Sequence, residues 1–514
     1  MAIRRYYADK DNSITNAFRT DLRLSDLIYS GSETETDTNL TRATGSNMGR
    51  ADILEVFSSY LTGSTIAGNE AQQLMRFLIQ FPVSDIITDR TAKRIPASGN
   101  VDFYLNLYNA PHSDTTPFDF TLQVLPLSRS WEEGRGLDMD NYMDSTYGGL
   151  GSNWKNAASG TAWTSQGGDY LSSPSYTQYF ETGRENLSVN ITPLVEQWIS
   201  GTITNYGVLV KLTSSNEAYY SNSSGVTSAS VPFNPNGAQT SYYTKKFFAR
   251  SSEYFFYRPN LEARWNDAVK DERSGFYVSS SNLPANMNLH TIYLYNYFRG
   301  KLYDIPAIGT GSIYVKVYTD PSGSETLAPT PNNPVTGSWV KTGVYKASFA
   351  LNTTASQVFD RWFDSSLTTC YQTGAIDIID FETSEPAPYQ IYVNKITNMK
   401  QYYSKDENAR FRIFTRDKNW SPNIYTVANS YVEPTIIESG SYKIFRIVDD
   451  LEIVNFSTGS EKYSELSYDV SGNYFDFNMS ILEQGYSYGI KLAYYNGDID
   501  SYVEQPELFK FKVI

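Results

Sequence analysis

The stretch Ser312-Ile313-Tyr314-Val315-Lys316-Val317-Tyr318 alternates between two kinds of side chain with a period of two. Because successive side chains of a strand point to opposite faces, its Ile and Val residues would share one face and its Tyr and Lys residues the other. Such alternation predicts a β-strand with one buried face. A similar run precedes it at residues 290–295, and other apolar runs of strand length extend in both directions along the chain.

The same kind of segment recurs over most of the chain, while helical periodicity is almost absent. Two short helices are expected, at residues 193–198, with Thr192 as N-cap before Pro193, and at residues 360–364. Asn496-Gly497 predicts a two-residue hairpin turn. Further strands are predicted at residues 53–57, 74–81, 101–108, 344–349, 375–379, 410–414, 441–448, 475–479, 488–495 and 509–513. This pattern predicts an all-β fold of β-sandwiches in series.

Length and composition predict several domains. With 514 residues, 15% of them aromatic, the chain is too long for one hydrophobic core and is rich in residues that suit half-buried sheet surfaces. The polar segment 30–44 favours an extended N-terminal arm, either a disordered terminus or an extension that docks on a neighbouring subunit. Two prolines within residues 382–388 favour a linker. We therefore expect an arm at 1–45 and three β-sandwiches at 46–267, 268–384 and 385–514.

The charge balance argues against a nucleic-acid partner. The chain has 42 basic and 56 acidic residues, a net charge of −14, and such a chain repels polyphosphate unless it holds a basic patch. No basic cluster exceeds short pairs such as Lys245-Lys246. No segment has the roughly 18 apolar residues of a membrane helix, and the N-terminus does not have the pattern of a signal peptide. The single Cys370 excludes an intramolecular disulfide, so we expect synthesis in a reducing cytoplasm.

The residues needed for common catalytic sites are scarce. The two histidines, His112 and His290, fall in different predicted domains and in ordinary turn or strand contexts. A structural role is the favoured interpretation of both, because His-dependent catalysis needs a nucleophile within hydrogen-bond distance. Histidines and cysteines are too few for a zinc site, and a Gly-rich phosphate loop is absent. The sequence therefore predicts a protein that is not an enzyme and has no cofactor.

One acidic loop offers a candidate cation site. Asp138, Asp140 and Asp144 cluster with Glu132 and Glu133 in the Gly- and Ser-rich stretch 134–173. Oxygen ligands on a loop can hold calcium, but the spacing differs from that of an EF-hand. A solvated acidic loop is the favoured alternative, because carboxylates are normally exposed.

An ordered set of motifs between residues 45 and 266 resembles the DNRLRE family of jelly-roll modules, which is also grouped with carbohydrate-binding modules. The set covers about two-fifths of the chain. Leu78 departs from the pattern, because the family usually has Asp there, and this puts any role of that carboxylate in doubt. The matching elements are the opening Gly45-Ser46-Asn47-Met48-Gly49, the strand Leu74-Met75-Arg76-Phe77-Leu78-Ile79, the turn Trp131-Glu132-Glu133-Gly134, Trp154, Trp163 with Gly167-Gly168-Asp169, the segment from Ser188 through Gln197-Trp198 to Gly207, and the closing segments Arg250-Ser251-Ser252-Glu253 and Arg258-Pro259-Asn260-Leu261.

The resemblance implies a jelly roll at 46–267 and draws attention to three tryptophans. Trp131, Trp154 and Trp163 are candidates to stack on sugar rings, as in carbohydrate-binding members of the family. They also coincide with framework positions of the family. Anchoring of the core or of loops is therefore the favoured interpretation, in keeping with the usual burial of Trp.

The C-terminal part is similar to immunoglobulin or fibronectin-III sandwiches. Leu482, Gly485 and Tyr488 resemble the tyrosine corner, in which a Tyr hydroxyl fixes the turn into a strand. Structural proteins of large tailed phages combine modules of these kinds, and both ends of this chain resemble such proteins.

This second resemblance implies a structural protein of the virion: a head, neck or collar, tail or fibre component assembled in the cytoplasm of the host bacterium. It implies a homo-oligomer whose partners are other virion proteins. The alternative is a carbohydrate-binding adhesin or accessory module that contacts host glycans, which an exposed aromatic strip would distinguish. A polysaccharide lyase or glycosidase is the least favoured class and would need a deep acidic cleft.

Overall fold

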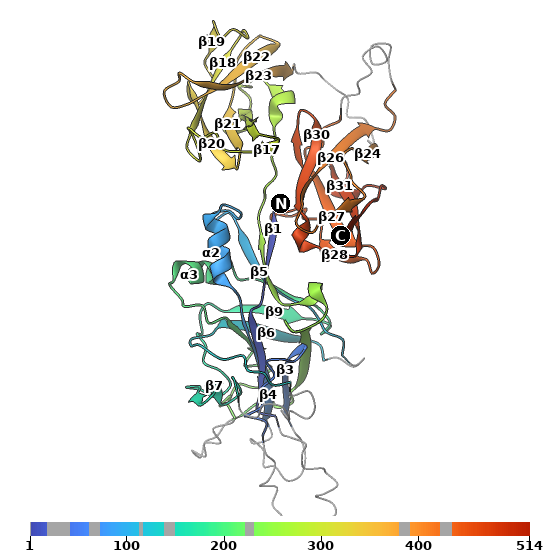
Figure 1. The fold of residues 1–514 in the computed structure, drawn as a ribbon. Helices are drawn as coiled ribbons and strands as arrows, with labels where there is room; N and C mark the ends of the chain where they lie inside the picture. The colour runs from blue at the N-terminus through green and yellow to red at the C-terminus, as the bar shows by residue number, and fades with distance from the viewer. Residues whose placement is uncertain are drawn as a thin grey trace, which may run out of the picture. The chain divides into compact units, whose positions relative to one another are not determined.

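Strands supply nearly all the regular structure in the part of the chain that the computed structural model describes. That part comprises residues 2–17, 42–60, 72–112, 117–137, 150–220, 231–379, 391–421 and 434–514. It divides into two compact units, Ala2–Trp265 and Asn266–Ile514 (Figure 1). The predicted all-β fold of tandem sandwiches is confirmed.

The first unit contains two principal sheets. The smaller has the order β1 (Ile3–Tyr7), β13 (Asn260–Arg264), β5 (Asp102–Leu107), β10 (Leu187–Asn190). The larger has the order β12 (Tyr242–Phe248), β3 (Ile53–Tyr60), β4 (Gln72–Gln80), β11 (Val208–Leu212), β6 (Phe120–Pro126), β9 (Tyr176–Phe180), and β2 (Lys10–Thr15) also pairs with β4. A separate small ribbon is formed by β7 (Asn156–Ala158) and β8 (Thr161–Ala162).

The expected N-terminal arm is wrong for residues 3–15, because they contain β1 (Ile3–Tyr7) and β2 (Lys10–Thr15). β1 is antiparallel to β13, and β2 continues the edge of β4 beyond the end of β3. The sequence of β2 is polar, yet Asp11, Asn12 and Ser13 are buried and hydrogen-bonded. A polar strand of this kind gives no apolar alternation from which to predict it. Residues 18–41 lie outside the described residues.

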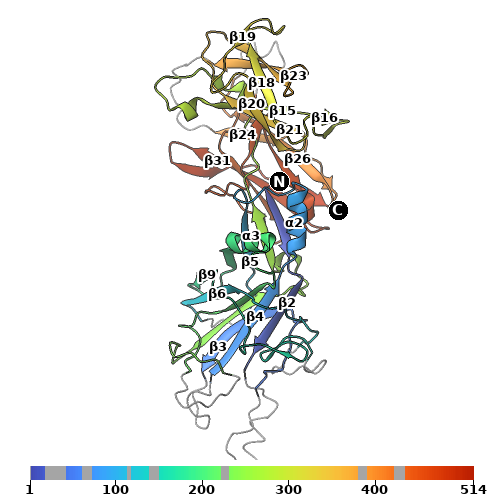
Figure 2. The same cartoon turned by 90° about the vertical axis from the view of Figure 1, so that its left-hand side faces the viewer.

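Two α-helices, α2 (Val83–Thr91) and α3 (Thr192–Ser200), lie side by side next to β5 in both views (Figures 1 and 2). α2 follows directly after Pro82 and was not expected from the sequence. Thr192 does not cap α3, because the N-cap is Ile191. The Thr192 hydroxyl oxygen instead accepts a hydrogen bond from the Phe103 amide at 2.8 Å, which ties α3 to β5.

The first sheet of the second unit is folded at β20 (Val335–Lys341), which pairs with different strands through its two ends. Its order is β14 (Phe276–Tyr277), β23 (Cys370–Ile379), β22 (Gln357–Phe363), β18 (Ile313–Tyr318), β20, β21 (Val344–Phe349), β15 (His290–Tyr295), and β19 (Thr326–Leu327) pairs with β18. β20 pairs with β18 through its first residues and with β21 through its last. Ile313, Val315 and Val317 are each 0% exposed and face the same core, as the alternation predicts.

The helix expected at residues 360–364 is wrong, because this segment belongs to β22. Val358, Asp360 and Trp362 are buried at alternate positions, which is the period of a strand. The Trp362 ring lies in the core, and its Nε1 donates to Asp360 at 2.6 Å.

The C-terminal part of the second unit is a sandwich with immunoglobulin strand order. One sheet runs β24 (Tyr392–Ile396), β26 (Asn408–Asp417), β30 (Gly472–Asn478), β29 (Ser467–Asp469). The other runs β25 (Tyr402–Tyr403), β33 (Phe509–Val513), β31 (Ser487–Asn496), β27 (Gly440–Arg446), β28 (Leu451–Val454), and β32 (Ser501–Glu504) pairs with β31. Read in chain order, these are the A-B-E-D and G-F-C-C′ sheets of that fold.

The predicted tyrosine corner is confirmed, and the predicted turn after β31 is longer than expected. The Tyr488 hydroxyl donates a hydrogen bond to the carbonyl oxygen of Glu483 at 2.8 Å. β31 and β32 form a hairpin, but their last pair is Asn496 with Ser501. The connection is therefore residues 497–500 rather than the two-residue turn that Asn496-Gly497 predicts. The expected linker at 382–388 lies outside the described residues.

Candidate functional site

The three candidate tryptophans all lie inside the first unit. Trp131, Trp154 and Trp163 are 3%, 0% and 5% exposed and share one apolar cluster with side chains of β2, β4 and β11. Trp131 Nε1 donates to the carbonyl oxygen of Tyr206 at 2.8 Å, and Trp163 Nε1 donates to that of Asn153 at 2.8 Å. These contacts fit the anchoring interpretation. None of the three indole rings has an exposed face on which a sugar ring could stack.

The three candidate calcium ligands, Asp138, Asp140 and Asp144, lie outside the described residues. Their neighbours Glu132 and Glu133 are described. Glu133 accepts hydrogen bonds from Arg250 Nε at 2.5 Å and Nη2 at 2.7 Å, and Glu132 accepts one from the Ser159 amide at 3.0 Å. Across the described ranges, no group of three or more His, Cys, Asp or Glu side chains is arranged to hold a metal ion.

Segments on which the DNRLRE resemblance rests meet at the side chain of Asn47, which is 0% exposed. Its Nδ2 donates to the carbonyl oxygens of Glu133 and Ser152, both at 2.8 Å, and its Oδ1 accepts from the Gly136 amide at 2.8 Å. Gly134 has a φ of 81°, and a Cβ there would lie 2.4 Å from the Asn47 side chain. The glycine that the motif specifies is therefore required by this close approach.

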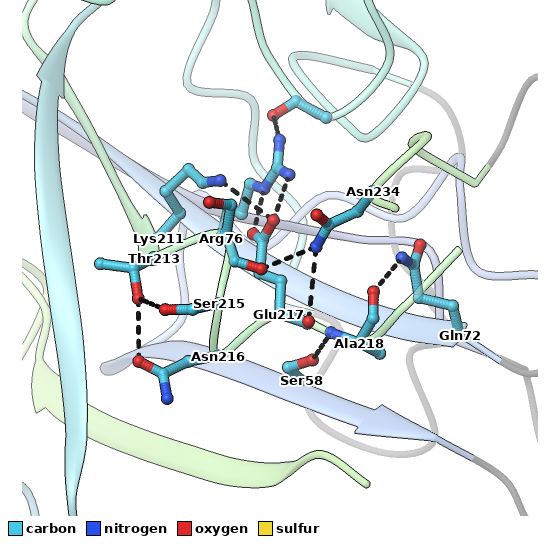
Figure 3. A network of polar contacts seen from close by, with 12 residues as sticks. Ser58, Gln72, Arg76, Lys211, Thr213, Ser215, Asn216, Glu217, Ala218 and Asn234 are labelled. Atoms are coloured by element: carbon cyan, nitrogen blue, oxygen red, sulfur yellow. Dashed lines mark hydrogen bonds and ion pairs between the residues drawn. The ribbon is translucent and has the colours of Figure 1, made fainter. Parts of the chain in front are cut away.

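A buried ionic triad connects β4 and β11 to the loop after β11 (Figure 3). Arg76 binds Glu217 through two hydrogen bonds, Nε to Oε1 at 3.0 Å and Nη2 to Oε2 at 3.1 Å. Lys211 Nζ donates to Oε2 of the same carboxylate at 3.0 Å, and all three side chains are only 5–6% exposed. Burial by itself raises the pKa of Glu217, but the charges of Arg76 and Lys211 outweigh it and lower that pKa.

The triad also reaches motif residues far away in the sequence. Arg76 Nη1 donates to the carbonyl oxygen of Gly167 at 3.0 Å, and its guanidinium lies 5.3 Å from the centre of the Trp154 ring. The backbone of Ala218, next to Glu217, is held by Ser58 and Gln72 (Figure 3). Glu217 was not predicted, because it lies in a Ser- and Asn-rich segment that reads as an interrupting loop. Every member of the triad therefore takes part in contacts that stabilise the fold.

A second buried cation, Lys245 on β12, has neutral hydrogen-bond partners. Its side chain is 0% exposed, and Nζ donates to Asn109 Oδ1 at 2.6 Å and to the carbonyl oxygen of Gly183 at 2.8 Å. Nζ also lies 5.2 Å and 5.1 Å from the ring centres of Phe180 and Phe247. Burial lowers the pKa of Lys245 to about 8, against an opposing effect of the nearby charge of Glu185. In the sequence, Lys245-Lys246 reads only as a short basic pair.

The two histidines lie in different units, as expected. His112 Nε2 lies 3.2 Å from Asn109 Oδ1, and burial together with the charges of Lys245 and Lys246 lowers the His112 pKa. His290 lies on β15, where its Nδ1 is 3.7 Å from Glu272, and burial lowers the His290 pKa despite that carboxylate.

One hairpin of the second unit presents a cluster of exposed aromatic side chains. It is formed by β16 (Tyr297–Phe298) and β17 (Lys301–Leu302), labelled separately in Figures 1 and 2. Tyr297, Phe298 and Tyr303 are 53%, 56% and 52% exposed, and the ring centres of Phe298 and Tyr303 are 5.7 Å apart. The Arg299 guanidinium lies 5.1 Å from the Phe298 ring centre. The sequence reasoning did not single out this hairpin, although Arg299-Gly300 between aromatic residues is a signal for it.

A backbone and a side-chain hydrogen bond close the base of the hairpin. The Tyr303 amide donates to the carbonyl oxygen of Asn296 at 3.0 Å, and Asn296 Nδ2 donates to that of Tyr303 at 2.6 Å. Arg299 and Gly300 both have positive φ, 49° and 78°, as a tight hairpin turn requires. The aromatic cluster is therefore carried on a fixed support.

Comparison with known proteins gives no family for this chain. No protein-family model matches it, and no curated protein matches it. Similar solved structures include the adhesin InvE of Yersinia pseudotuberculosis, at 10% identity over 43% of this chain with a TM-score of 0.15, and a marsupial T cell receptor, at 10% identity over 48% with a TM-score of 0.15. The match spans 54% of the adhesin chain and 70% of the receptor chain. A Salmonella alpha-2-macroglobulin reacted with methylamine matches at 9% identity over 100% of this chain and 34% of that chain, also with a TM-score of 0.15. TM-scores this low support no conclusion about the fold or the function of this chain.

Among the described residues, no helix has the length and apolar character needed to cross a bilayer.

Proposed function

We propose that this chain is a structural component of a tailed-bacteriophage virion and acts through protein–protein assembly. The tandem sandwiches and the internal use of the candidate residues Trp131, Trp154 and Trp163 support a building role. The resemblance of the modules to phage structural proteins supplies the virion context.

The main support for the assembly role is the aromatic hairpin β16–β17. Aromatic and Arg side chains are the residues most enriched at the energetic centres of protein interfaces. Here the Phe298 ring packs against both Tyr303 and Arg299 on a hydrogen-bonded hairpin, so little side-chain and backbone freedom remains to be lost on binding. The hairpin carries Arg299 and Lys301 in a chain with a net charge of −14. An acidic protein surface, such as one on another copy of this chain, is complementary to it.

The first experiment is to determine the oligomeric state of the full chain by light scattering and electron microscopy, and to look for its density in the particle from which it comes. We expect a defined oligomer or a defined position in the particle. The double variant Phe298→Ser/Tyr303→Ser should weaken assembly. Phe118→Ser in the first unit, which also removes an exposed ring (64% exposed), is the control and should leave assembly unchanged. A monodisperse monomer that is absent from any particle would overturn the proposal.

The same hairpin favours a second candidate, a carbohydrate-binding adhesin or accessory module. Exposed aromatic rings beside cationic and amide groups also suit the faces and hydroxyls of sugars. A glycan array with the wild type and the Phe298→Ser/Tyr303→Ser variant separates the two functions. Glycan binding that the variant loses, together with a monomeric wild type, would favour this second function.

A further inference from the structure

Lys245 and Asn109 bring an amine and a carboxamide together across the first unit. Lys245 lies on β12 of the larger sheet, and Asn109 lies two residues beyond β5 of the smaller one, in a bridge with Phe247. The distance from Lys245 Nζ to Asn109 Oδ1 is 2.6 Å. Because an amide C=O bond is about 1.2 Å long, Nζ is within about 3.8 Å of Asn109 Cγ. This is close to the separation of reacting atoms in a near-attack arrangement.

The surroundings favour a neutral, nucleophilic amine. Within the described residues, no ion pair of Nζ with a carboxylate is found, and its acceptors are the neutral oxygens of Asn109 and Gly183. The rings of Phe180 and Phe247, each 0% exposed, both lie close to the ammonium position, with their centres 5.2 Å and 5.1 Å from Nζ. Burial of an unpaired ammonium is costly, and the pKa of Lys245 falls to about 8 for this reason. An appreciable fraction of the lysine therefore carries a free electron pair near neutral pH.

Two further groups suit proton transfer and polarisation of the amide. Glu185 accepts a hydrogen bond from the Thr182 amide through Oε1 at 2.6 Å, while its Oε2 is buried without a hydrogen-bond partner among the described residues. Its charge interacts with that of Lys245. His112 Nε2 lies 3.2 Å from Asn109 Oδ1, where a neutral imidazole with its proton on Nε2 would stabilise negative charge on that oxygen.

We propose that Lys245 and Asn109 react to form an intramolecular isopeptide bond. The electron pair of Nζ attacks Asn109 Cγ, and His112 stabilises the oxyanion of the tetrahedral intermediate. Glu185 takes a proton from Nζ and delivers it to Asn109 Nδ2. The Nζ–Cγ bond forms, the Cγ–Nδ2 bond breaks, and one molecule of ammonia leaves. The step exchanges one amide for another and needs no oxidant, reductant or cofactor.

The bond would join the two sheets of the first unit covalently. It would connect the end of β5 to β12, between residues 136 positions apart in the sequence. It goes beyond the proposed assembly role, because it concerns the internal stability of one chain and does not depend on any partner.

The test is the mass of the purified full-length protein. We expect a mass lower than that of the sequence by one ammonia molecule, after allowance for removal of Met1. After tryptic digestion, the peptide of Asn109 should be found joined to that of Lys245. A full sequence mass with two separate peptides would overturn the proposal, and so would loss of ammonia at any other residue.

Variants assign the roles within the site. Asn109→Ala and Lys245→Met should both restore the full sequence mass, while the matched control Lys246→Met, on the neighbouring position of β12, should keep the ammonia loss. Glu185→Gln should fold, as judged by circular dichroism, and remain uncross-linked. Complete cross-linking of the folded Glu185→Gln protein would remove Glu185 from the mechanism and overturn this part of the proposal.

Discussion

The hydroxyl of Tyr488 and the carbonyl oxygen of Glu483 are joined by a hydrogen bond of 2.8 Å at the entrance to β31. The Tyr488 ring is 0% exposed, so removal of its hydroxyl takes this partner from the partly buried carbonyl group of Glu483. The corner thus fixes both the turn and the start of a central strand of the C-terminal sandwich.

Replacement of Tyr488 by Phe should therefore lower the free energy of unfolding of the second unit by about 1–2 kcal/mol. Urea unfolding followed by fluorescence measures this change. Tyr486→Phe is the matched control, since Tyr486 is 38% exposed and its ring lies against Arg446, a contact that Phe retains. Equal stability of the two variants would contradict a structural role of the corner.

Glu217→Gln should destabilise the first unit strongly, because it leaves the buried charges of Arg76 and Lys211 without their counter-ion. Breaking a buried pair in this way costs about 3–5 kcal/mol. Glu407→Gln, which breaks the exposed pair with Lys400, should cost less than about 1 kcal/mol. The comparison by urea unfolding decides whether the triad stabilises the fold, and similar costs for both variants would contradict it.

The effect of Glu217→Gln should also depend on pH. The pKa of Glu217 is lowered in the folded protein, so its ionised form contributes stability above the ordinary value of 4.5, and this contribution is lost as the pH falls through the folded value. The difference in unfolding free energy between wild type and variant should therefore shrink as the pH falls below 4.5. A difference that stays constant over this range would show that ionisation of Glu217 has no part in it.

Asp11 should show the opposite pH dependence. Burial raises the pKa of this carboxyl to about 7 from an ordinary value of 3.8, and the nearby Glu133 adds to the effect. The stability that protonated Asp11 contributes is complete below the unfolded value and is lost as the pH rises towards 7. The Asp11→Asn variant does not titrate, so its advantage over wild type should grow by up to about 4 kcal/mol between pH 4 and pH 8.

Urea unfolding at several pH values measures this advantage, with Asp52→Asn at an exposed position as the control. An advantage of Asp11→Asn that does not change with pH would show that Asp11 remains ionised when buried.

Loss of the proposed cross-link should destabilise the first unit alone. A covalent closure over a loop of this length raises the unfolding free energy by about 5 kcal/mol in the chain-entropy model. Glu185→Gln should thus lower the thermal transition of residues 2–265 and leave that of residues 266–514 unchanged. Calorimetry resolves the two transitions, and an unchanged first transition in an uncross-linked Glu185→Gln protein would contradict this stabilising effect.

The sequence predicts those parts of the fold in which apolar side chains alternate. The alternation of Ile313, Val315 and Val317 predicts their strand directly. The spacing of Tyr488 from Leu482 and Gly485 predicts the tyrosine corner. β2 is different, since its buried side chains are polar and are satisfied by partners far along the chain. The same is true of Asp360 on β22, where a buried carboxylate interrupts the apolar face and conceals the strand.

The candidate sites were harder to predict than the fold. The tryptophan positions could be read from the motifs, but whether an indole is buried or exposed depends on the packing of distant strands. In the sequence, Glu217 lies in a segment that reads as a polar loop, and Lys245 reads only as part of a short basic pair. Their burial follows from neighbours such as Arg76 and Phe180, which approach them only when the sheets have formed.

The pairing of β1 with β13 bears on the order of events during synthesis. Ile3 lies opposite Arg264, so β1 leaves the ribosome long before its partner β13 is made. β2 and β3 can join β4 much earlier, because their residues are closer along the chain. The larger sheet can thus assemble on the nascent chain, while the smaller sheet closes only after residue 264 has emerged. Until then β13's neighbour β5 has an open edge, and a chaperone or a second nascent chain has its best opportunity to bind there.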